Sequence, residues 1–447
     1  MIKQAFKVIR EEGDQILGAV FLGGEEKLRF RGDYASLGAP LILRADPFTA
    51  LKEALTKYQP EAVLDISDEP VVGYEERFKL ASISLLAGAS YRGADFRFDP
   101  PLFHEVSTKP SLGIAGLGKR VGKTAISAHI ARKLKEEGYK LAVVAMGRGG
   151  PAQPEVLYGQ TEIFTPEYLL KVSEQGKHAA SDYFEDALMA KVTTVGCRRC
   201  GGGMAGKTFI SNVLEGAHQA NKLEEEFLIF EGSGAALPPI KTDASLLVIS
   251  AAQPLNYTEG YFGPYRVLLS NMVVITACEQ PLASPDKIQK LNDVIKEINP
   301  DVKVVQTIFR PSPLEKIRGK KAFLTTTSSP LLKQTLKDYL EKEFGCVVTG
   351  ISFNLSRPEK LRSEILAHKD EFDVLLTELK AAGVEVATRF GKELGAPIVY
   401  TDNIPLVVGG DGNLDQDLVA LAESAISAFE SKTEFTKGVT NVKKGPS

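Results

Sequence analysis

Short apolar runs alternate with amphipathic segments along most of the chain. Runs such as Leu112–Ala115, Leu141–Ala145 and Phe227–Phe230 are typical of strands that are buried on both faces. Segments such as Thr124–Glu137 and Asp286–Ile298 carry apolar residues at helical spacing. Because strands alternate with helices, the pattern predicts a three-layer α/β fold in which helices cover both faces of parallel sheets.

The same pattern predicts three α/β domains, at 1–108, 109–314 and 315–447, and the Pro100-Pro101 pair lies near the first boundary. The first domain begins with a predicted helix at Ile2–Glu12, whereas an open α/β domain usually begins with a strand. We therefore expect its first strand to be missing. The other elements of this domain are predicted as strands at Ile16–Leu22, Leu41–Arg44 and Ala62–Ile66 and helices at Pro47–Tyr58 and Tyr74–Leu86.

Polar residues follow the predicted strands of the third domain. Strands are expected at Ala322–Thr326, Val347–Phe353, Val374–Leu376 and Ile398–Tyr400, and helices at Pro330–Glu343, Pro358–Ala367, Leu379–Leu394 and Asp415–Ser431. Three strand ends carry the polar runs Thr325-Thr-Thr, Thr377-Glu378-Leu-Lys380 and Thr401-Asp402-Asn403. Because the carboxyl ends of parallel strands share one edge of a sheet, we expect these runs to face one crevice.

The stretch Ser111–Thr124 reads S-L-G-I-A-G-L-G-K-R-V-G-K-T and predicts a nucleotide-phosphate loop between a strand and a helix. Lys123 would reach the β- and γ-phosphates, and the Thr124 hydroxyl would bind Mg²⁺. The spacing departs from the usual motif, because Leu117 holds the place of the first glycine, and an ordinary glycine-rich turn is the alternative interpretation. The residues predicted to contact the nucleotide are Gly116, Gly118, Lys119, Arg120, Val121, Gly122, Lys123, Thr124 and Ala125.

An acidic residue ends the predicted strand Phe227–Phe230 and is followed by glycines, in the run Glu231-Gly-Ser-Gly. A carboxylate at this place in a P-loop domain orders the Mg²⁺ shell opposite the loop threonine. The sequence therefore predicts Thr124 and Glu231 as the metal-binding residues.

Arginines among glycines occur at two further places. Arg148 lies in Met-Gly-Arg-Gly-Gly-Pro, after the predicted strand Leu141–Ala145, and this arrangement favours an anion, although a solvated arginine is the alternative. Arg198 and Arg199 lie between Cys197 and Cys200, ahead of three glycines. We interpret that stretch as a flexible anion-binding loop. A zinc site would need a second pair of ligands, which the sequence lacks at matching spacing. A redox-active Cys-x-x-Cys motif should begin a helix, whereas three glycines follow here. Both functions remain alternatives.

The composition limits the partners. The chain has 447 residues, a net charge of −3, four cysteines and no apolar stretch that could span a bilayer. We expect a cytoplasmic protein that binds neither nucleic acid nor membrane and acts on a small molecule. The residues do not determine the oligomeric state, and a homodimer is our expectation.

Several motifs together resemble the cyclic 2,3-diphosphoglycerate synthetase family. These are G-x-G-K-R-V-G-K-T-A, V-A-M-G-R-G-G-P, G-C-R-R-C-G-G-G-M-A-G and F-E-G-S-G, with D-I-S-D-E-P-V-V-G-Y and T-E-L-K-A-A extending the resemblance over nearly the whole chain. The resemblance implies that ATP and 2,3-diphosphoglycerate yield the cyclic diphosphate, ADP and phosphate. On this interpretation Lys123 contacts the γ-phosphate, and the residues that cancel substrate charge are Lys119, Arg120, Arg148, Arg198 and Arg199.

Two other functions fit the same fold. The P-loop and the Glu-Gly-x-Gly strand end also look like dethiobiotin synthetase, an ATP-dependent ligase that activates a carboxylate. A nucleotide-switched ATPase of the partitioning type is the other alternative. Its signature lysine would stand at Gly118, whereas this chain has Lys119 one residue later, which argues against a switch.

Overall fold

The computed structural model describes residues 2–22 and 38–442, and the side chains of these residues up to 434. Contacts divide the chain into two compact units. The smaller comprises Met1–Leu102, Pro254–Leu269 and Val294–Pro300, and the larger comprises Phe103–Gln253, Ser270–Asp293 and Asp301–Ser447. The predicted division into three domains stays a prediction.

The smaller unit has short strands and longer helices. Its elements are α1 (Ile2–Glu11), β1 (Ala19–Val20), β2 (Leu41–Ile42), α2 (Pro47–Tyr58), β3 (Ala62–Leu64), α3 (Tyr74–Leu86), β4 (Ser90–Arg92), β5 (Arg97–Phe98), α8 (Asn256–Glu259) and α9 (Gly263–Leu268). Strands β1 and β2 pair in parallel, and β3, β4 and β5 form a separate sheet. The predicted helices are confirmed, but the predicted strands are longer than the observed ones.

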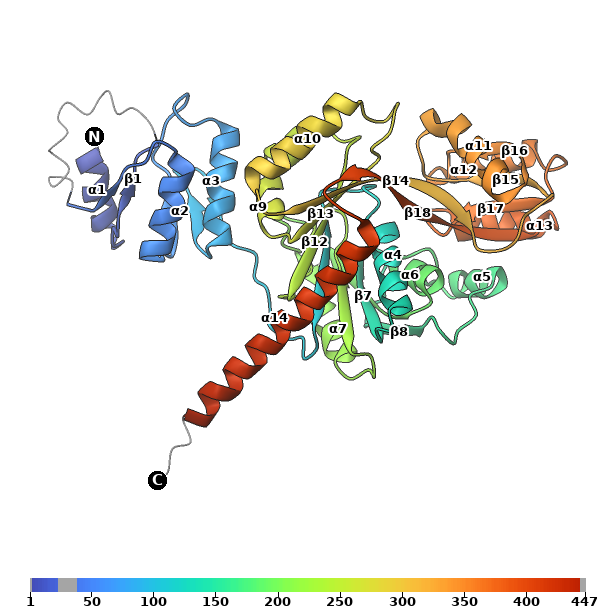
Figure 1. Ribbon diagram of the computed structural model, residues 1–447, viewed down its shortest axis with the longest axis horizontal. Coiled ribbons are helices and arrows are strands. Elements are labelled where there is room, and N and C mark those ends of the chain that lie inside the picture. The colour runs from blue at the N-terminus through green and yellow to red at the C-terminus, as the bar shows by residue number, and fades with distance from the viewer. Residues whose placement is uncertain (1, 23–37, 443–447) are drawn as a thin grey trace. The chain divides into compact units, whose positions relative to one another are not determined.

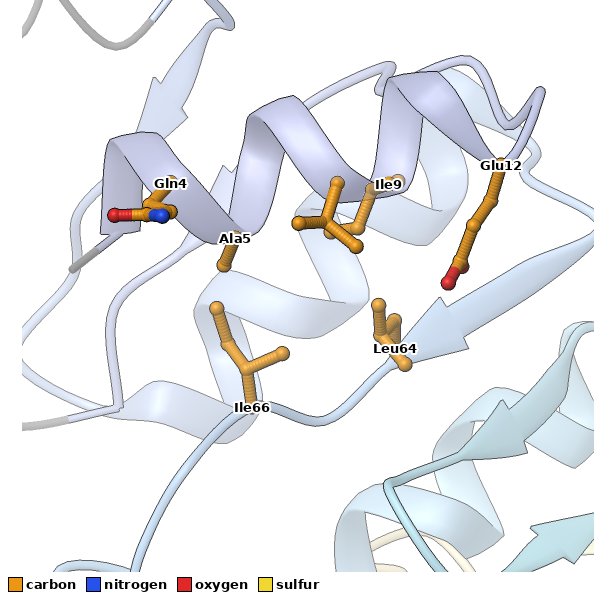
Figure 2. A pocket seen from close by; sticks show the side chains of 7 residues that line it. Gln4, Ala5, Ile9, Glu12, Leu64 and Ile66 are labelled. Atoms are coloured by element: carbon orange, nitrogen blue, oxygen red, sulfur yellow. The ribbon is translucent and has the colours of Figure 1, made fainter.

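An apolar cavity of about 470 Å³ lies between α1 and the chain that leaves β3. Figure 2 shows Ala5 and Ile9 of α1 on one side, facing Leu64 and Ile66 on the other. Ile66 is 52% exposed, so the cavity is open to solvent. The expectation that a first strand is missing from this domain stays a prediction.

The larger unit is built on one thirteen-stranded sheet. Its strands are β6 (Ser111–Gly116), β7 (Leu141–Gly147), β8 (Glu155–Tyr158), β9 (Thr193–Cys200), β10 (Ile210–Ser211), β11 (Phe227–Glu231), β12 (Ala244–Ser250), β13 (Met272–Thr276), β14 (Lys303–Pro313), β15 (Lys321–Thr325), β16 (Val347–Ser352), β17 (Val374–Glu378) and β18 (Ile398–Gly410). The strand order is β10-β9-β7-β11-β6-β12-β13-β14-β18-β17-β15-β16, with β8 paired to β9. The predicted α/β class with a mostly parallel sheet is confirmed.

Helices cover both halves of this sheet. They are α4 (Lys123–Glu136), α5 (Pro166–Glu174), α6 (Asp182–Ala190), α7 (Val213–Ala220), α11 (Lys333–Phe344), α12 (Pro358–Ala367), α13 (Arg389–Glu393) and α14 (Leu414–Val442), while α10 (Pro285–Ile298) is divided between the two units. Strands β6, β7, β11, β12 and β13 are almost completely buried, as expected for parallel strands with helices on both faces. The nucleotide-loop half contains β6 to β14, and the carboxyl-terminal half contains β15 to β18. The two halves share one sheet, because β14 pairs with β18 in antiparallel fashion (Figure 1).

Three sequence predictions for this unit are wrong in detail. The Cys-Arg-Arg-Cys stretch is not a flexible loop but the end of β9, because it pairs with β7 on one side and with β10 on the other. The predicted helix Leu379–Leu394 begins instead with a turn and a π-helical segment at Gly383–Thr388. The predicted strand Ile398–Tyr400 continues to Gly410, because pairing with β14 carries it past the polar residues that interrupt its apolar run.

None of the helices among the described residues combines the length and the apolar character that a bilayer crossing requires.

Candidate active site

The glycine-rich loop is held rigidly between β6 and α4. Gly122 has a positive φ of 88° and caps α4, and Arg120 also has a positive φ, of 60°. The Leu117 amide donates to the Val248 carbonyl at 3.0 Å. The Thr276 hydroxyl donates to the Val121 carbonyl at 2.7 Å, so the ends of β12 and β13 both support the loop. The predicted order of strand, loop and helix is confirmed, with α4 beginning one residue earlier than expected.

Lys123 is the buried cation at the centre of the site. Its side chain is 7% exposed, and its ammonium donates a short hydrogen bond to Glu231 Oε1 at the end of β11. Burial lowers the pKa of Lys123, but the charges of Glu231, Asp182 and Asp186 more than compensate, so its pKa is raised. The ammonium therefore keeps its proton at neutral pH.

Two carboxylates beside Lys123 have oxygens without a hydrogen-bond partner. Both Asp186 oxygens and Glu231 Oε2 are buried and receive no hydrogen bond from a donor group, and the carboxyl groups of Asp186 and Glu231 lie close to each other. Burial, followed by the charge of Glu231, raises the pKa of Asp186 well above its usual range. Asp182 begins α6, and one of its oxygens lies over Gly147, where β7 ends. Burial raises the pKa of Asp182 as well.

These oxygens fit a hard cation. Mg²⁺ prefers oxygen ligands and in nucleotide sites takes one or two from the protein, with the rest from phosphates and water. No group of three or more His, Cys, Asp or Glu side chains among the described residues is arranged to hold a metal alone. The unpaired oxygens of Glu231 and Asp186, close to the Lys123–Thr124 start of α4, match the smaller set that a nucleotide-bound Mg²⁺ needs.

A basic group lies at Gly234, beside the glycine-rich loop. Arg199 is 8% exposed, and its Nη2 donates to the Ser233 carbonyl at 2.7 Å while its Nη1 donates to the Gly201 carbonyl at 2.9 Å. Its buried Nε has no partner. Arg199 Nη2 and the Lys119 stem both border Gly234. Burial and the charge of Arg148 lower the pKa of Arg199. The structure thus brings Lys119 and Arg199 together at Gly234.

Arg198 lies apart from this group. It is exposed, and its Nε donates to the Gly150 carbonyl at 3.1 Å, because successive side chains of a strand alternate between its faces. The same alternation separates the cysteines, since Cys197 is buried against Gly216 and Cys200 is exposed. Burial raises the pKa of Cys197 to about 12. Cys197 is therefore a packing residue, and the pair is not arranged to bind one metal ion or to form a disulfide.

The carboxyl-terminal half reaches the glycine-rich loop. A Cβ atom at Gly122 would lie 2.2 Å from the Phe309 ring, and Arg120 Nη2 donates to the Ser356 hydroxyl at 3.2 Å. The predicted meeting of polar strand ends is confirmed in this half. Glu378 accepts hydrogen bonds from the Thr326 and Thr327 hydroxyls, the Thr327 amide and Asn403.

Three charged residues near the site were missed by the sequence analysis, namely Asp182, Glu185 and Asp186, and Lys380 was expected in a crevice of the third domain and not beside α6. A signal was present in α6, where three acidic residues stand in a short helix whose other positions are mostly apolar. Glu185 is 7% exposed and pairs with Lys380 at 2.9 Å. Burial raises the pKa of Glu185 to about 8, although the charge of Lys380 opposes this shift. Acidic residues in a buried helix are uncommon without a partner or a ligand.

Comparisons with known proteins identify relatives over most of the chain. Three family models match the chain: the N-terminal domain of cyclic 2,3-diphosphoglycerate synthetase over residues 1–99, its P-loop domain over 111–308 and its C-terminal domain over 313–404. The cyclic 2,3-diphosphoglycerate synthetase of Methanothermus fervidus is 45% identical over 96% of this chain and 95% of its own. That of Rubrobacter xylanophilus is 47% identical over 93% of each chain.

We predict that Gly122→Ala disrupts the loop more than positive φ alone explains. An alanine at positive φ costs about 1–2 kcal/mol, and at Gly122 it also meets the Phe309 ring. Gly138→Ala is the matched control, because Gly138 has a φ of 91° with open space around it. Denaturant unfolding should show the larger loss for Gly122→Ala, together with weakened ADP binding, whereas Gly138→Ala should bind ADP normally. Equal losses in the two variants would exclude the contact with Phe309 as a constraint on the loop.

Proposed function

The chain belongs to the cyclic 2,3-diphosphoglycerate synthetase family, and we propose that it uses ATP to close 2,3-diphosphoglycerate into its cyclic phosphoanhydride, releasing ADP and phosphate. The observation that carries this proposal is the pair of charged zones at one glycine-rich loop. A buried lysine among carboxylates suits a nucleotide with Mg²⁺, and a separate basic group of Lys119, Arg148 and Arg199 suits a second polyanion.

The reaction divides into two displacements. In the first, an oxygen of one substrate phosphate attacks the γ-phosphorus of ATP, the bond to the β-phosphate oxygen breaks, and ADP leaves. In the second, the other substrate phosphate attacks the phosphorus that has been activated, and inorganic phosphate leaves as the ring closes. Neither step needs a nucleophilic side chain, so the protein contributes positioning and charge.

Lys123 is the cation for the transferred phosphoryl group. Its ammonium stands at the start of α4, where the helix amides add a partial positive charge. When bound, Mg²⁺ neutralises charge that develops on the phosphates. Thr124 and Glu231 are the residues that would hold it, with Asp182 and Asp186 beside them.

The basic group is the site proposed for the substrate phosphates. Arg199 is fixed by two carbonyls and still has a buried Nε without a partner. Lys119 and Arg148 are exposed, so both can move toward a ligand. Arg198 and Arg120, which contact Gly150 and Ser356, are proposed as further contributors of charge. We further propose a cytoplasmic homodimer that takes no nucleic acid and no membrane as a partner.

The choice of substrate separates this function from its alternatives. ADP release should accelerate with 2,3-diphosphoglycerate and should not respond to 3-phosphoglycerate, which lacks the second phosphate. A ligase of the dethiobiotin synthetase type would respond to a carboxylate substrate with an amine, and a partitioning-type switch would hydrolyse ATP without either. Equal ADP release with and without 2,3-diphosphoglycerate would contradict the proposal.

We predict that Lys123→Met lowers kcat by about 100-fold or more while the protein stays folded, because a preorganised cation at the transferring group contributes about 3 kcal/mol or more. Lys135→Ala is the matched control, since Lys135 is exposed on the same helix. The measurement is steady-state ADP release, with circular dichroism to verify folding. A folded Lys123→Met variant with the parent rate would show that the loop assignment is wrong.

We predict that Arg199→Ala raises the KM for 2,3-diphosphoglycerate about 10- to 100-fold, the size expected when one charge-assisted hydrogen bond is lost. The KM for ATP should change less than about threefold, because Arg199 lies outside the loop that holds the nucleotide. Cys200→Ser is the control at the neighbouring exposed position of β9. If both KM values rose together in Arg199→Ala, the residue would support the fold of the site and not the substrate.

A further inference from the structure

Lys380 occupies a fixed place at the end of β17. Glu378, two residues earlier, accepts hydrogen bonds from Thr326, Thr327 and Asn403. Leu379 is 1% exposed and belongs to the same core cluster as Leu112 and Ile126 of the nucleotide-loop half. The backbone that precedes Lys380 is therefore held by both halves of the sheet.

The backbone that follows Lys380 is equally constrained. Ala381 has a positive φ of 48°, which is costly for a residue with a side chain. The Gly383 amide donates to the Lys380 carbonyl at 2.8 Å, and a Cβ atom at Gly383 would lie 2.3 Å from the Glu378 carbonyl oxygen. A backbone conformation held against this cost is often found at functional sites.

The side chain of Lys380 leaves its own half and pairs with α6. Lys380 Nζ lies 2.9 Å from Glu185 Oε1, and the two side chains are 26% and 7% exposed. A second pair that joins the same two parts of the chain, Lys392 with Glu167, is 3.8 Å long with side chains 53% and 61% exposed. An exposed pair of that kind contributes little, whereas removing Lys380 would leave the buried Glu185 carboxyl group without its partner.

Helix α6 carries the carboxylates of the nucleotide centre on the residues around Glu185. The charges of Asp182 and Asp186 both raise the pKa of Lys123, and the oxygens of Asp186 are buried without a hydrogen-bond donor. The position of α6 therefore determines where these oxygens stand relative to Lys123 and Glu231. Lys380 is the cation of the carboxyl-terminal half that contacts this helix at Glu185.

We propose that Lys380 is a positioning residue of the nucleotide centre: by pairing with Glu185 it holds α6 so that Asp182 and Asp186 face the Mg²⁺ that accompanies the nucleotide. This inference rests on the proposed nucleotide site, but it does not depend on the identity of the second substrate. It gives the carboxyl-terminal half a direct part in nucleotide chemistry.

The test compares ADP affinity in Mg²⁺ with ADP affinity in EDTA, measured by titration calorimetry on the full chain. Lys380→Met should weaken ADP binding about 5- to 10-fold in Mg²⁺ and less than about twofold in EDTA, because the glycine-rich loop is untouched. Lys392→Met, which removes the exposed pair, should change neither affinity. If Lys380→Met does not fold, Glu185→Gln removes the same pair with little change of shape and carries the same expectation.

The double variant Glu185→Lys with Lys380→Glu exchanges the two charges of the pair. It tests whether Lys380 acts by holding α6 in position or by contacting MgADP directly. If the double variant binds ADP in Mg²⁺ within about threefold of the parent affinity, the pair itself is what holds α6 in position. An unrestored affinity in the reversed variant would overturn the proposal, as would an unchanged Mg²⁺ effect in folded Lys380→Met. Because ADP binding requires no ring closure, a parent that binds MgADP but forms no cyclic product would contradict the proposed function and leave this inference standing.

Discussion

The balance of charge around Lys123 is the constraint on which the site depends. The buried Lys123 ammonium donates a hydrogen bond to Glu231, and Asp182 and Asp186 of α6 add further negative charge. Burying carboxylates is costly unless they are paired, protonated or bound to a cation. A raised pKa offsets part of this cost at Asp186, and a bound cation would offset it at the buried oxygens of both Asp186 and Glu231. A nucleotide with Mg²⁺ supplies both the cation for the carboxylates and the phosphates for Lys123.

The single sheet explains how two halves of the chain contribute to this balance. Pairing of β14 with β18 joins them, and Phe309 of β14 lies against Gly122 of the glycine-rich loop. From the other side of the junction, Lys380 reaches Glu185 on α6. Residues far apart in sequence thus restrain both the loop that holds phosphates and the helix that holds carboxylates. Positioning of this kind is the main contribution a protein makes to phosphoryl transfer.

The sequence predicted the parts of the site that depend on local pattern. The strand, glycine-rich loop and helix were located to within one residue at α4, because the glycines and the apolar spacing are local signals. The Cys-Arg-Arg-Cys stretch was misassigned, because it is a strand only through its pairing with β7 and β10. Asp186 and Lys380 were not assigned to the site. The role of Asp186 depends on the burial of α6, and that of Lys380 depends on its contact with Glu185 across the sheet. Local spacing holds no information on either.

The most direct test of this account is the identity and amount of the products. Phosphorus NMR of the protein with ATP, Mg²⁺ and 2,3-diphosphoglycerate resolves the substrate phosphates, the cyclic phosphoanhydride, ADP and inorganic phosphate in one sample. The account predicts equal amounts of cyclic product, ADP and inorganic phosphate, because each closure consumes one activated phosphate. Formation of ADP and phosphate while both substrate phosphates stay unchanged would contradict it.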